Sequence, residues 1–541
     1  MPEKDLIHLT IDGQRVEAPR GTVVLEAARA AGIRIPHYCY HPGLSRVGSC
    51  RLCLVEIEKS PKLQPSCSTP VSEGMVVRTG TPQALENRRS VLEFLLANHP
   101  LDCPVCDQAG ECELQNYYMA HGRYDARYND NKSKRKKATP IGPRIILDQE
   151  RCILCTRCVR FTREISRTFE LGVIERGHRS FIDIFPGREL ENRYSGNIAD
   201  ICPVGAMTDR DFRFQCRVWF LGSADSVCPG CSRGCNIEIH YNNRFNPRYH
   251  TRRVERLKPR YNGRVNSYWM CDEGRYAYHA IDAPNRLSRP DPGPDGASGE
   301  DAWSSAIGRV AASIKDAVAG YGAESVAVVA SPQMTNEELF AVRRLFFDAL
   351  GIGTIAFRAP AREEPRSDDL LITADRHPNS RGAEILLPPG GGVGDLLRAC
   401  SEGRIRVLYL FHHDLTAGYD PGFIRSALGR VPQVIFQGSW SHPTAELASV
   451  RLPAAVYAEK EGTFTNIQGR VQRIRAAVPP VGHSMPDLAI LARLGAELGA
   501  PLGSDPEAVF DEIAGSVDAF SGMTYASLGG GGALLKQGAG A

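Results

Sequence analysis

Sixteen potential metal ligands, fifteen cysteines and one histidine, stand out in the first 271 residues of this 541-residue chain. By spacing they form four sets of four: Cys39, Cys50, Cys53 and Cys67; His99, Cys103, Cys106 and Cys112; Cys152, Cys155, Cys158 and Cys202; and Cys228, Cys231, Cys235 and Cys271. An iron–sulfur cluster takes four thiolate or imidazole ligands, and a CxxC pair suits adjacent positions on one cluster. Four such sets predict a protein that conducts electrons.

Two other uses of cysteine compete with this interpretation. Disulfides require an oxidising compartment, and the N-terminal MPEKDLIHLT lacks the basic-then-apolar profile of a secretory signal. Structural zinc uses the same residue types, but its sites usually pair two doublets. Cys152, Cys155 and Cys158 instead form a C-x2-C-x2-C triplet with a distant Cys202-Pro203, the bacterial ferredoxin pattern. Iron–sulfur clusters are therefore favoured, and zinc stays open at single sites.

Length and composition indicate a soluble chain of several domains. A chain of 541 residues can form three or more domains, each with its own core. The net charge of +3 gives no bias toward nucleic acid. No apolar run approaches the roughly 18–20 residues that span a bilayer. The two cysteines outside the sets, Cys216 and Cys400, are interpreted as ordinary buried thiols.

The first set is expected in a small β-rich domain. Residues 6–11 alternate in polarity, Asp12-Gly13 supplies a turn, and residues 22–31 are typical of a helix that ends before Gly32. The loop around Cys50 is rich in Gly and Ser, so backbone amides can reach the sulfurs and tune the cluster potential. The pattern resembles a β-grasp [2Fe–2S] ferredoxin domain.

The second set follows a predicted helix over residues 84–97. Cys103, Cys106 and Cys112 provide three ligands, and His99 is the candidate for the fourth. An imidazole is neutral where a thiolate is negative, so this ligand would change the charge and potential of the cluster. A lone histidine is more often a polar residue at a helix end, and the chemistry alone leaves its role open.

The sequence around these two sets resembles a known family. HPLDCPVCDQAGECELQ, preceded by YCYHPGLSRVGSCRLCLVEIE, is similar to the large iron–sulfur subunit of respiratory complex I. This family includes the bacterial G subunit of NADH:quinone oxidoreductase and the mitochondrial 75-kDa subunit. Its members carry a histidine-ligated [4Fe–4S] cluster at this point. The resemblance therefore implies that His99 is a ligand.

The third and fourth sets each predict one [4Fe–4S] cluster. No second triplet lies near Cys202, so the third set fits a ferredoxin-like domain that has lost its partner cluster. The fourth set, C-x2-C-x3-C followed by Cys271 after 35 residues, resembles the N-terminal domain of molybdopterin enzymes such as formate dehydrogenases. This gap is longer than the family usually shows. Zinc or an empty thiol set therefore stays open here.

The remainder of the chain predicts a parallel α/β domain. Apolar segments at 325–330, 406–411 and 433–436 are typical of buried strands, and 336–350 and 394–403 are typical of helices. The stretches SPQMTNEELF and AEKEGTFTNIQGRVQ resemble molybdopterin oxidoreductases. The domain is thus expected to descend from one that held a molybdenum cofactor.

A molybdenum ligand is nevertheless missing from the expected place. Catalytic relatives carry a cysteine, selenocysteine or serine a helix beyond TNEE. Residues 353–371 contain no cysteine or histidine and no serine before Ser367, and the only cysteine of the domain is Cys400. We therefore expect no molybdopterin and a degenerate domain that serves as a scaffold.

The predicted fold is multidomain, with α/β and α+β parts. Its divisions are a β-grasp [2Fe–2S] ferredoxin-like domain at 1–80, a [4Fe–4S] segment with one histidine and three cysteine ligands at 81–140, a ferredoxin-like [4Fe–4S] domain at 141–220, a molybdopterin-oxidoreductase-type [4Fe–4S] domain at 221–283, a linker at 284–300, the degenerate molybdopterin-oxidoreductase-like α/β domain at 301–528 and a flexible tail at 529–541.

The resemblance covers nearly the whole chain and implies an electron-transfer subunit of proton-translocating NADH:quinone oxidoreductase. Electrons would arrive from a flavin-bearing subunit, pass the Cys39, Cys152 and His99 sets in that order, and leave through a ferredoxin-like neighbour toward quinone. The Cys228 set would lie off this route.

The implied partners are the flavin- and NADH-binding subunit, a [2Fe–2S] subunit, and ferredoxin-like and quinone-module subunits. The implied location is the cytoplasmic face of the bacterial inner membrane, with membrane contact only through the complex. We expect no catalytic residue, NADH site or quinone site in this chain, and no nucleic-acid partner.

Two other functions remain open. A molybdenum- or tungsten-dependent formate dehydrogenase-like subunit would need an unusual metal ligand. A diaphorase subunit of an NAD-linked hydrogenase would use the same clusters in another assembly.

Overall fold

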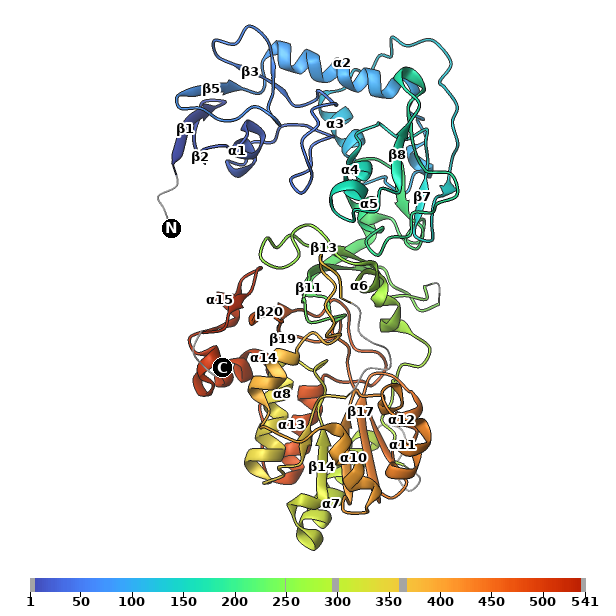
Figure 1. Ribbon diagram of the computed structural model, residues 1–541, viewed down its shortest axis with the longest axis vertical. Coiled ribbons are helices and arrows are strands. Elements are labelled where there is room, and N and C mark those ends of the chain that lie inside the picture. The colour runs from blue at the N-terminus through green and yellow to red at the C-terminus, as the bar shows by residue number, and fades with distance from the viewer. Residues whose placement is uncertain (1–4, 249, 294–300, 360–366, 537–541) are drawn as a thin grey trace. The chain divides into compact units, whose positions relative to one another are not determined.

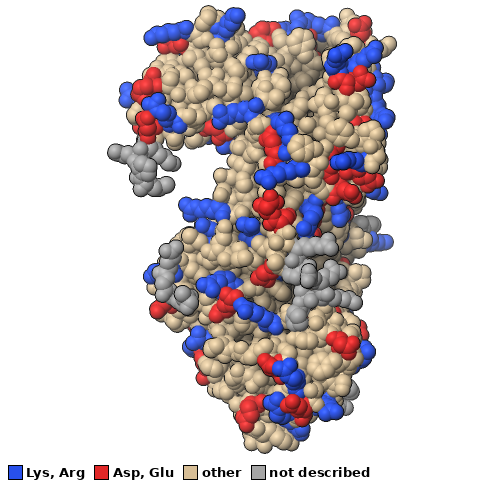
Figure 2. All heavy atoms as spheres, viewed as in Figure 1, with Lys and Arg blue, Asp and Glu red and all other residues tan. Residues whose placement is uncertain are grey.

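The computed structural model describes residues 5–248, 250–293, 301–359 and 367–536. The second part of the predicted linker, the last five residues of the predicted tail and the middle of the 353–371 stretch lie outside these described residues. The chain divides into two compact units, Met1–Leu221 and Gly222–Ala541, called here the N-terminal and C-terminal units. Charges of both signs are interspersed on the face shown in Figure 2, in line with the near-neutral net charge.

The N-terminal unit begins with a five-stranded sheet of order β2-β1-β5-β3-β4. Its strands are β1 (Leu6–Ile11), β2 (Gln14–Pro19), β3 (Leu54–Ile57), β4 (Gln64–Pro65) and β5 (Met75–Arg78). The predicted turn at Asp12 and Gly13 has positive φ at both residues, +48° and +84°, as a tight two-residue hairpin requires. Helix α1 (Val24–Ala30) covers the sheet and is followed by Gly32 at φ +77°, which confirms the predicted helix.

The elements that carry the second and third sets follow. They are α2 (Pro82–Asn98), the 3₁₀ turn Cys103–Val105, α3 (Glu113–His121), β6 (Thr139–Pro140), β7 (Ile145–Leu147), α4 (Arg157–Glu164), β8 (Leu171–Ile174), β9 (Phe181–Ile184), α5 (Asn197–Ile201) and β10 (Met207–Asp209). Thr81 caps α2 by accepting a hydrogen bond from the Ala84 amide. The helix ends at Asn98 because Pro100 disfavours helical backbone at His99, which is extended.

The C-terminal unit opens with a three-stranded sheet of order β11-β12-β13, in which β12 and β13 are antiparallel. It contains β11 (Leu221–Val227), β12 (Asn236–Asn242) and β13 (Val254–Pro259), followed by α6 (Asp272–Tyr276) and the 3₁₀ turn Ala277–Asp282. The hairpin of β12 and β13 occupies the long interval between Cys235 and Cys271. It returns the chain to the cysteine loop, so the length of this interval is compatible with one four-ligand site.

The predicted parallel α/β domain is confirmed. Its sheet has the order β15-β14-β16-β17-β18, and every neighbouring pair is parallel. The strands are β14 (Val326–Val329), β15 (Ile355–Ala356), β16 (Val407–Phe411), β17 (Gln433–Gly438) and β18 (Val450–Pro453). One face of this sheet packs against helices α7 (Ala302–Tyr321), α8 (Asn336–Val342) and α13 (Asp487–Leu498). The other face packs against α10 (Val393–Ser401) and α11 (Pro421–Leu428) (Figure 1).

One predicted helix of this domain changes its hydrogen-bonding pattern part-way along. Residues 336–350 were expected to form a continuous helix, but α8 continues from Arg343 to Ala349 as a π-helix. The remaining elements are α9 (Ser380–Leu386), α12 (Pro443–Glu446), α14 (Pro506–Ser516), α15 (Tyr525–Leu528) and a small antiparallel sheet of β19 (Gly462–Thr465), β20 (Arg470–Ile474) and β21 (Ala533–Leu534). Within the described ranges, no helix is long and apolar enough to cross a membrane.

Candidate metal centres

The four cysteines of the first set come together in the loops between α1 and β5. The thiol of Cys50 hydrogen-bonds the Cys39 sulfur and lowers the pKa of Cys39 to about 5. A second pair forms between Cys53 and Cys67, where the hydrogen bond from Cys53 lowers the pKa of Cys67. The backbone amides of Ser49 and Cys50 also reach the Cys39 sulfur, as expected from the Gly- and Ser-rich loop. The same hydrogen bonds, together with burial, raise the pKa of Cys50 and that of Cys53, so each pair favours one thiolate beside one thiol.

The cysteines of the third set line one small cavity of about 20 Å³. Leu154 and Thr156 take left-handed conformations, φ +53° and +58°, which turn the chain between successive cysteines of the set before α4 begins. Burial raises the pKa of Cys152 to about 12 and that of Cys155 to about 11. A free thiol here is therefore protonated, and a bound cation would be needed to hold the thiolate form.

Cys202 completes the third cavity from the end of α5. Burial raises the pKa of this thiol, while the backbone amides of Val204, Met207 and Ala206 hydrogen-bond its sulfur and oppose the shift. Pro203 disfavours helical backbone at Cys202, which is extended, so α5 ends before it and a turn follows. The turn therefore offers several donors to a ligated thiolate.

The second set is less enclosed. Of the cysteines, all of which lie in described residues, Cys103 is the one whose side chain is exposed. Cys106 is buried, and burial raises the pKa of Cys112 to about 11, with Cys106 and Cys103 near enough to add to the shift. This set thus carries a thiol at the protein surface.

His99 lies at the end of α2, and its imidazole is mostly buried. Burial lowers its pKa to about 4, so the ring is neutral at physiological pH. Its Nδ1 atom is buried and has no hydrogen-bond partner among the described residues. A neutral ring with an unsatisfied nitrogen fits a metal ligand. However, the cavity of about 200 Å³ that His99 lines includes Cys152 of the third set and, in the described chain, no cysteine of its own set.

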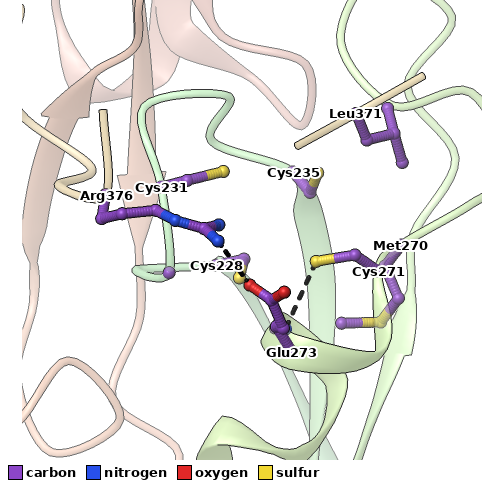
Figure 3. A pocket seen from close by; sticks show the side chains of 10 residues that line it. Cys228, Cys231, Cys235, Met270, Cys271, Glu273, Leu371 and Arg376 are labelled. Atoms are coloured by element: carbon purple, nitrogen blue, oxygen red, sulfur yellow. Dashed lines mark hydrogen bonds and ion pairs between the residues drawn. The ribbon is translucent and has the colours of Figure 1, made fainter. Parts of the chain in front are cut away.

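The fourth set lines a cavity of about 120 Å³ (Figure 3). Cys228, Cys231 and Cys235 come from the loop between β11 and β12, and Cys271 caps α6 by accepting a hydrogen bond of 3.4 Å from the Gly274 amide. All four are buried. Burial raises the pKa of Cys271 to about 11.

The arrangement of the donor side chains and the enclosure of the cavities bear on the kind of metal centre that these sites can hold. Among the described residues, no three His, Cys, Asp or Glu side chains are arranged to hold a single metal ion. The ligands of one zinc ion share a centre at about 2.3 Å, whereas those of a cluster bind different irons and stand farther apart. The cysteine-lined cavities of the third and fourth sets have the donor type and enclosure that a cluster needs.

Two arginines that the sequence motifs did not reveal connect the first and third sets. The Nη2 group of Arg160 donates hydrogen bonds to the carbonyl oxygens of Cys39 (2.5 Å) and Cys155 (3.1 Å). Arg157 donates to the carbonyls of Tyr40 and Ile201, at 2.7 and 3.1 Å. Both lie in RCILCTRCVRF, but nothing in that motif indicates which distant loop they contact.

The second set is tied just as directly to the third. The Glu113 amide donates to the Pro203 carbonyl at 3.1 Å, next to the predicted ligands Cys112 and Cys202. Gly205 approaches Cys106 so closely that a Cβ atom would lie 2.3 Å from its sulfur. The three N-terminal sets are thus neighbours.

The two remaining cysteines are buried, as predicted. Cys400 lies on α10, fully buried in an apolar cluster, and burial raises its pKa to about 12. Cys216 is 8% exposed.

Known protein families match most of this arrangement. The matches are a 2Fe-2S iron-sulfur cluster binding domain over residues 4–82, the NADH-ubiquinone oxidoreductase-G iron-sulfur binding region over 88–127, the ferredoxin-like domain of NADH-quinone oxidoreductase subunit 3 over 142–208, and molybdopterin oxidoreductase over 362–497.

Relatives match over far longer stretches. The G subunit of NADH-quinone oxidoreductase from Rickettsia felis is 31% identical, over 92% of this chain and 89% of the relative. The chain belongs to the family of NADH-quinone oxidoreductase G subunits. The G subunit from Streptomyces coelicolor is 35% identical over 85% of this chain and 54% of its own, and the mitochondrial 78 kDa subunit of NADH-ubiquinone oxidoreductase from Neurospora crassa is 29% identical over 92% and 82%.

A solved structure also shares part of the sequence. A chain of an NAD+-reducing [NiFe]-hydrogenase is 33% identical and covers 39% of this chain and 90% of its own length, with a TM-score of 0.34. The family membership confirms the predicted fold class, the [2Fe–2S] and [4Fe–4S] cofactors, and the function as an iron–sulfur electron-transfer subunit of NADH:quinone oxidoreductase. Its partners are other subunits of that complex.

Proposed function

We propose that the four sets are the cluster ligands of this subunit. The [2Fe–2S] cluster takes Cys39, Cys50, Cys53 and Cys67; the [4Fe–4S] clusters take His99, Cys103, Cys106 and Cys112, then Cys152, Cys155, Cys158 and Cys202, and finally Cys228, Cys231, Cys235 and Cys271. When bound, these clusters supply one-electron transfer between a flavin-bearing partner and partners that lead to quinone.

A single apolar cluster in the N-terminal unit carries this proposal. Cys39 and Cys155 belong to its buried part, and Cys50, Cys112, Cys152 and Cys202 pack against it. It therefore contains ligands of the first, second and third sets, held together by buried side chains such as Tyr38 and Leu52. Close packing of these side chains keeps the three sites at fixed separations.

Contacts between the sets support electron transfer among them. The first set adjoins the third through Arg160, and the third adjoins the second through Pro203 and Gly205. The first set also adjoins the second, because Tyr38, next to Cys39, packs against Tyr117 of α3. The order first, third, second is the one that the family resemblance implies. It ends at the set with the exposed Cys103, where an electron-accepting partner can approach.

The partners we propose are a flavin- and NADH-binding subunit at the electron entrance, a [2Fe–2S] subunit beside it, and a ferredoxin-like subunit of the quinone module at the exit. The proposed location is the peripheral part of the complex on the cytoplasmic face of a bacterial inner membrane. The fourth set belongs to the C-terminal unit and has its own cavity, so we place it off the path.

Elemental analysis of anaerobically purified protein tests the assignment. One binuclear and three tetranuclear clusters give about 14 iron atoms per chain. A value of about 10, with EPR identifying the missing signal, would remove one [4Fe–4S] set from the assignment. Stoichiometric molybdenum or tungsten would overturn the interpretation of the α/β domain as a scaffold and make the chain a catalyst.

A further inference from the structure

The cavity of the fourth set has a wall that comes from the α/β domain. Leu371 and Arg376 line it together with the four cysteines (Figure 3). They belong to the segment that precedes α9, about 100 residues beyond the last cysteine of the set. The site is therefore completed by a domain that contributes no ligand to it.

Hydrogen bonds fasten this segment to the cysteine loop. The Ser232 amide donates to the Asp375 carbonyl at 2.9 Å, and the hydroxyls of Ser232 and Thr373 lie 3.0 Å apart. Arg233 donates from Nε to the Leu371 carbonyl at 3.2 Å. Ser232 and Arg233 lie between the ligands Cys231 and Cys235, so the segment and the loop form one unit.

The segment is also rigid in itself. One carboxylate oxygen of Asp368 accepts hydrogen bonds from the amides of Leu370, Leu371 and Ile372, at 3.0, 3.0 and 2.9 Å. Asp375 accepts from the His377 amide at 3.1 Å. A turn fixed at both ends can hold Leu371 and Arg376 in place against the cavity.

An ion pair joins this segment to α6, on the far side of the cavity from the cysteine loop. Arg376 Nη2 lies 2.8 Å from Glu273 Oε2, and Glu273 is on α6, two residues after Cys271. The two side chains are 34% and 49% exposed, so the pair sits where the cavity meets solvent. Exposed pairs add little to stability. This pair instead connects the α/β domain to the helix that carries the last ligand.

We propose that residues 371–376 form a lid over the fourth cluster site and that Arg376 is its positioning residue, latched to Glu273. The retained role of the α/β domain is then to shield this cluster from water, oxygen and chelators. This inference rests on the proposed cluster assignment of the Cys228 set.

The test uses the full chain, purified anaerobically, as wild type and as Arg376→Ala and Glu273→Gln. A ferrous chelator is added, and the kinetics of iron release and the EPR signal of the fourth cluster are followed. We expect both variants to lose about four irons several-fold faster than wild type, while the other clusters keep their rates. The reversed pair, Arg376→Glu with Glu273→Arg, should restore slow release.

The matched control is Arg381→Ala. Arg381 lies on α9 in the same domain, pairs with Glu384 at 3.1 Å, and does not line the cavity. If the wild-type chain contains all of the expected iron and both Arg376→Ala and Glu273→Gln release it at the wild-type rate, the lid is overturned and the cluster assignment stands. A wild-type chain that lacks the four irons would overturn the cluster assignment and the lid with it.

Discussion

The second and fourth ligand sets have similar residue types but opposite access to the surface. The second set shares the apolar cluster of its neighbours and places Cys103 at the surface. The fourth set is buried at all four cysteines, in a separate unit, under a segment of another domain. Electron exchange with a partner requires close approach, whereas long retention of a cluster requires enclosure. The second set is therefore suited to electron transfer with a partner, and the fourth set is suited to a structural role.

The largest expected contrast comes from removing one ligand in each unit. Cys155→Ser should abolish NADH-driven quinone reduction in the assembled complex, because the proposed path runs through the third set. Cys228→Ser should lose its cluster and some stability while most of that activity persists. Loss of activity in a stable, assembled Cys228→Ser complex would place the fourth set on the path and remove the contrast.

The second prediction tests whether His99 is a ligand of the second set, which has the exposed Cys103. His99→Cys replaces a neutral ligand by a negative one, so the cluster should remain but its reduction potential should fall and its EPR signal should change. His121→Cys, at the end of α3, is the control and should leave the spectrum as it is. An unchanged spectrum in His99→Cys would take this histidine off the ligand list.

A third prediction concerns the rigidity of the unit that encloses the fourth set. Lys460 is buried between Glu338 and Asp487, with its Nζ atom 2.8 Å from a carboxylate oxygen of each. Lys460→Met removes the cation that the buried carboxylates of Glu338 and Asp487 share, although Asp487 keeps His412 at 3.0 Å. The change should reduce the unfolding free energy of this unit by about 3–5 kcal/mol. Denaturant unfolding measures this. The control is Arg398→Met, which removes an exposed ion pair and should change the unfolding free energy by less than about 0.5 kcal/mol. If Lys460→Met had an equally small effect, the buried network would not stabilise this unit.

The smallest expected effect is a pH dependence in the same unit. Burial raises the pKa of Glu337 from 4.5 to about 7, so the folded state keeps a proton that the unfolded state releases. The stabilisation is complete below pH 4.5 and is lost as the pH rises through about 7, roughly 3 kcal/mol in all. Glu337→Gln should flatten this dependence in unfolding measurements at several pH values. An equally steep dependence in the variant would assign it to other groups.

Features that local spacing encodes could be predicted from the sequence. The first hairpin, helix α2 and the parallel sheet follow from turn residues, caps and apolar periodicity. The contact between Ser232 and Thr373, 141 residues apart, could not be predicted, because no short-range pattern specifies such pairing. The bridge that Arg160 makes between Cys39 and Cys155 was missed for the same reason. The π-helix after α8 also departs from the expected helix, since periodicity does not register a local change of helical pitch.

Freeze-quench EPR of the intact complex mixed with NADH tests the central claim most directly. The signals of the Cys39, Cys152 and His99 sets should appear within one turnover. The signal that Cys228→Ser removes should stay absent on this timescale, because the fourth set is enclosed and we propose that it lies off the path. Its appearance at the same rate as the others would contradict the division between transferring and enclosed sets.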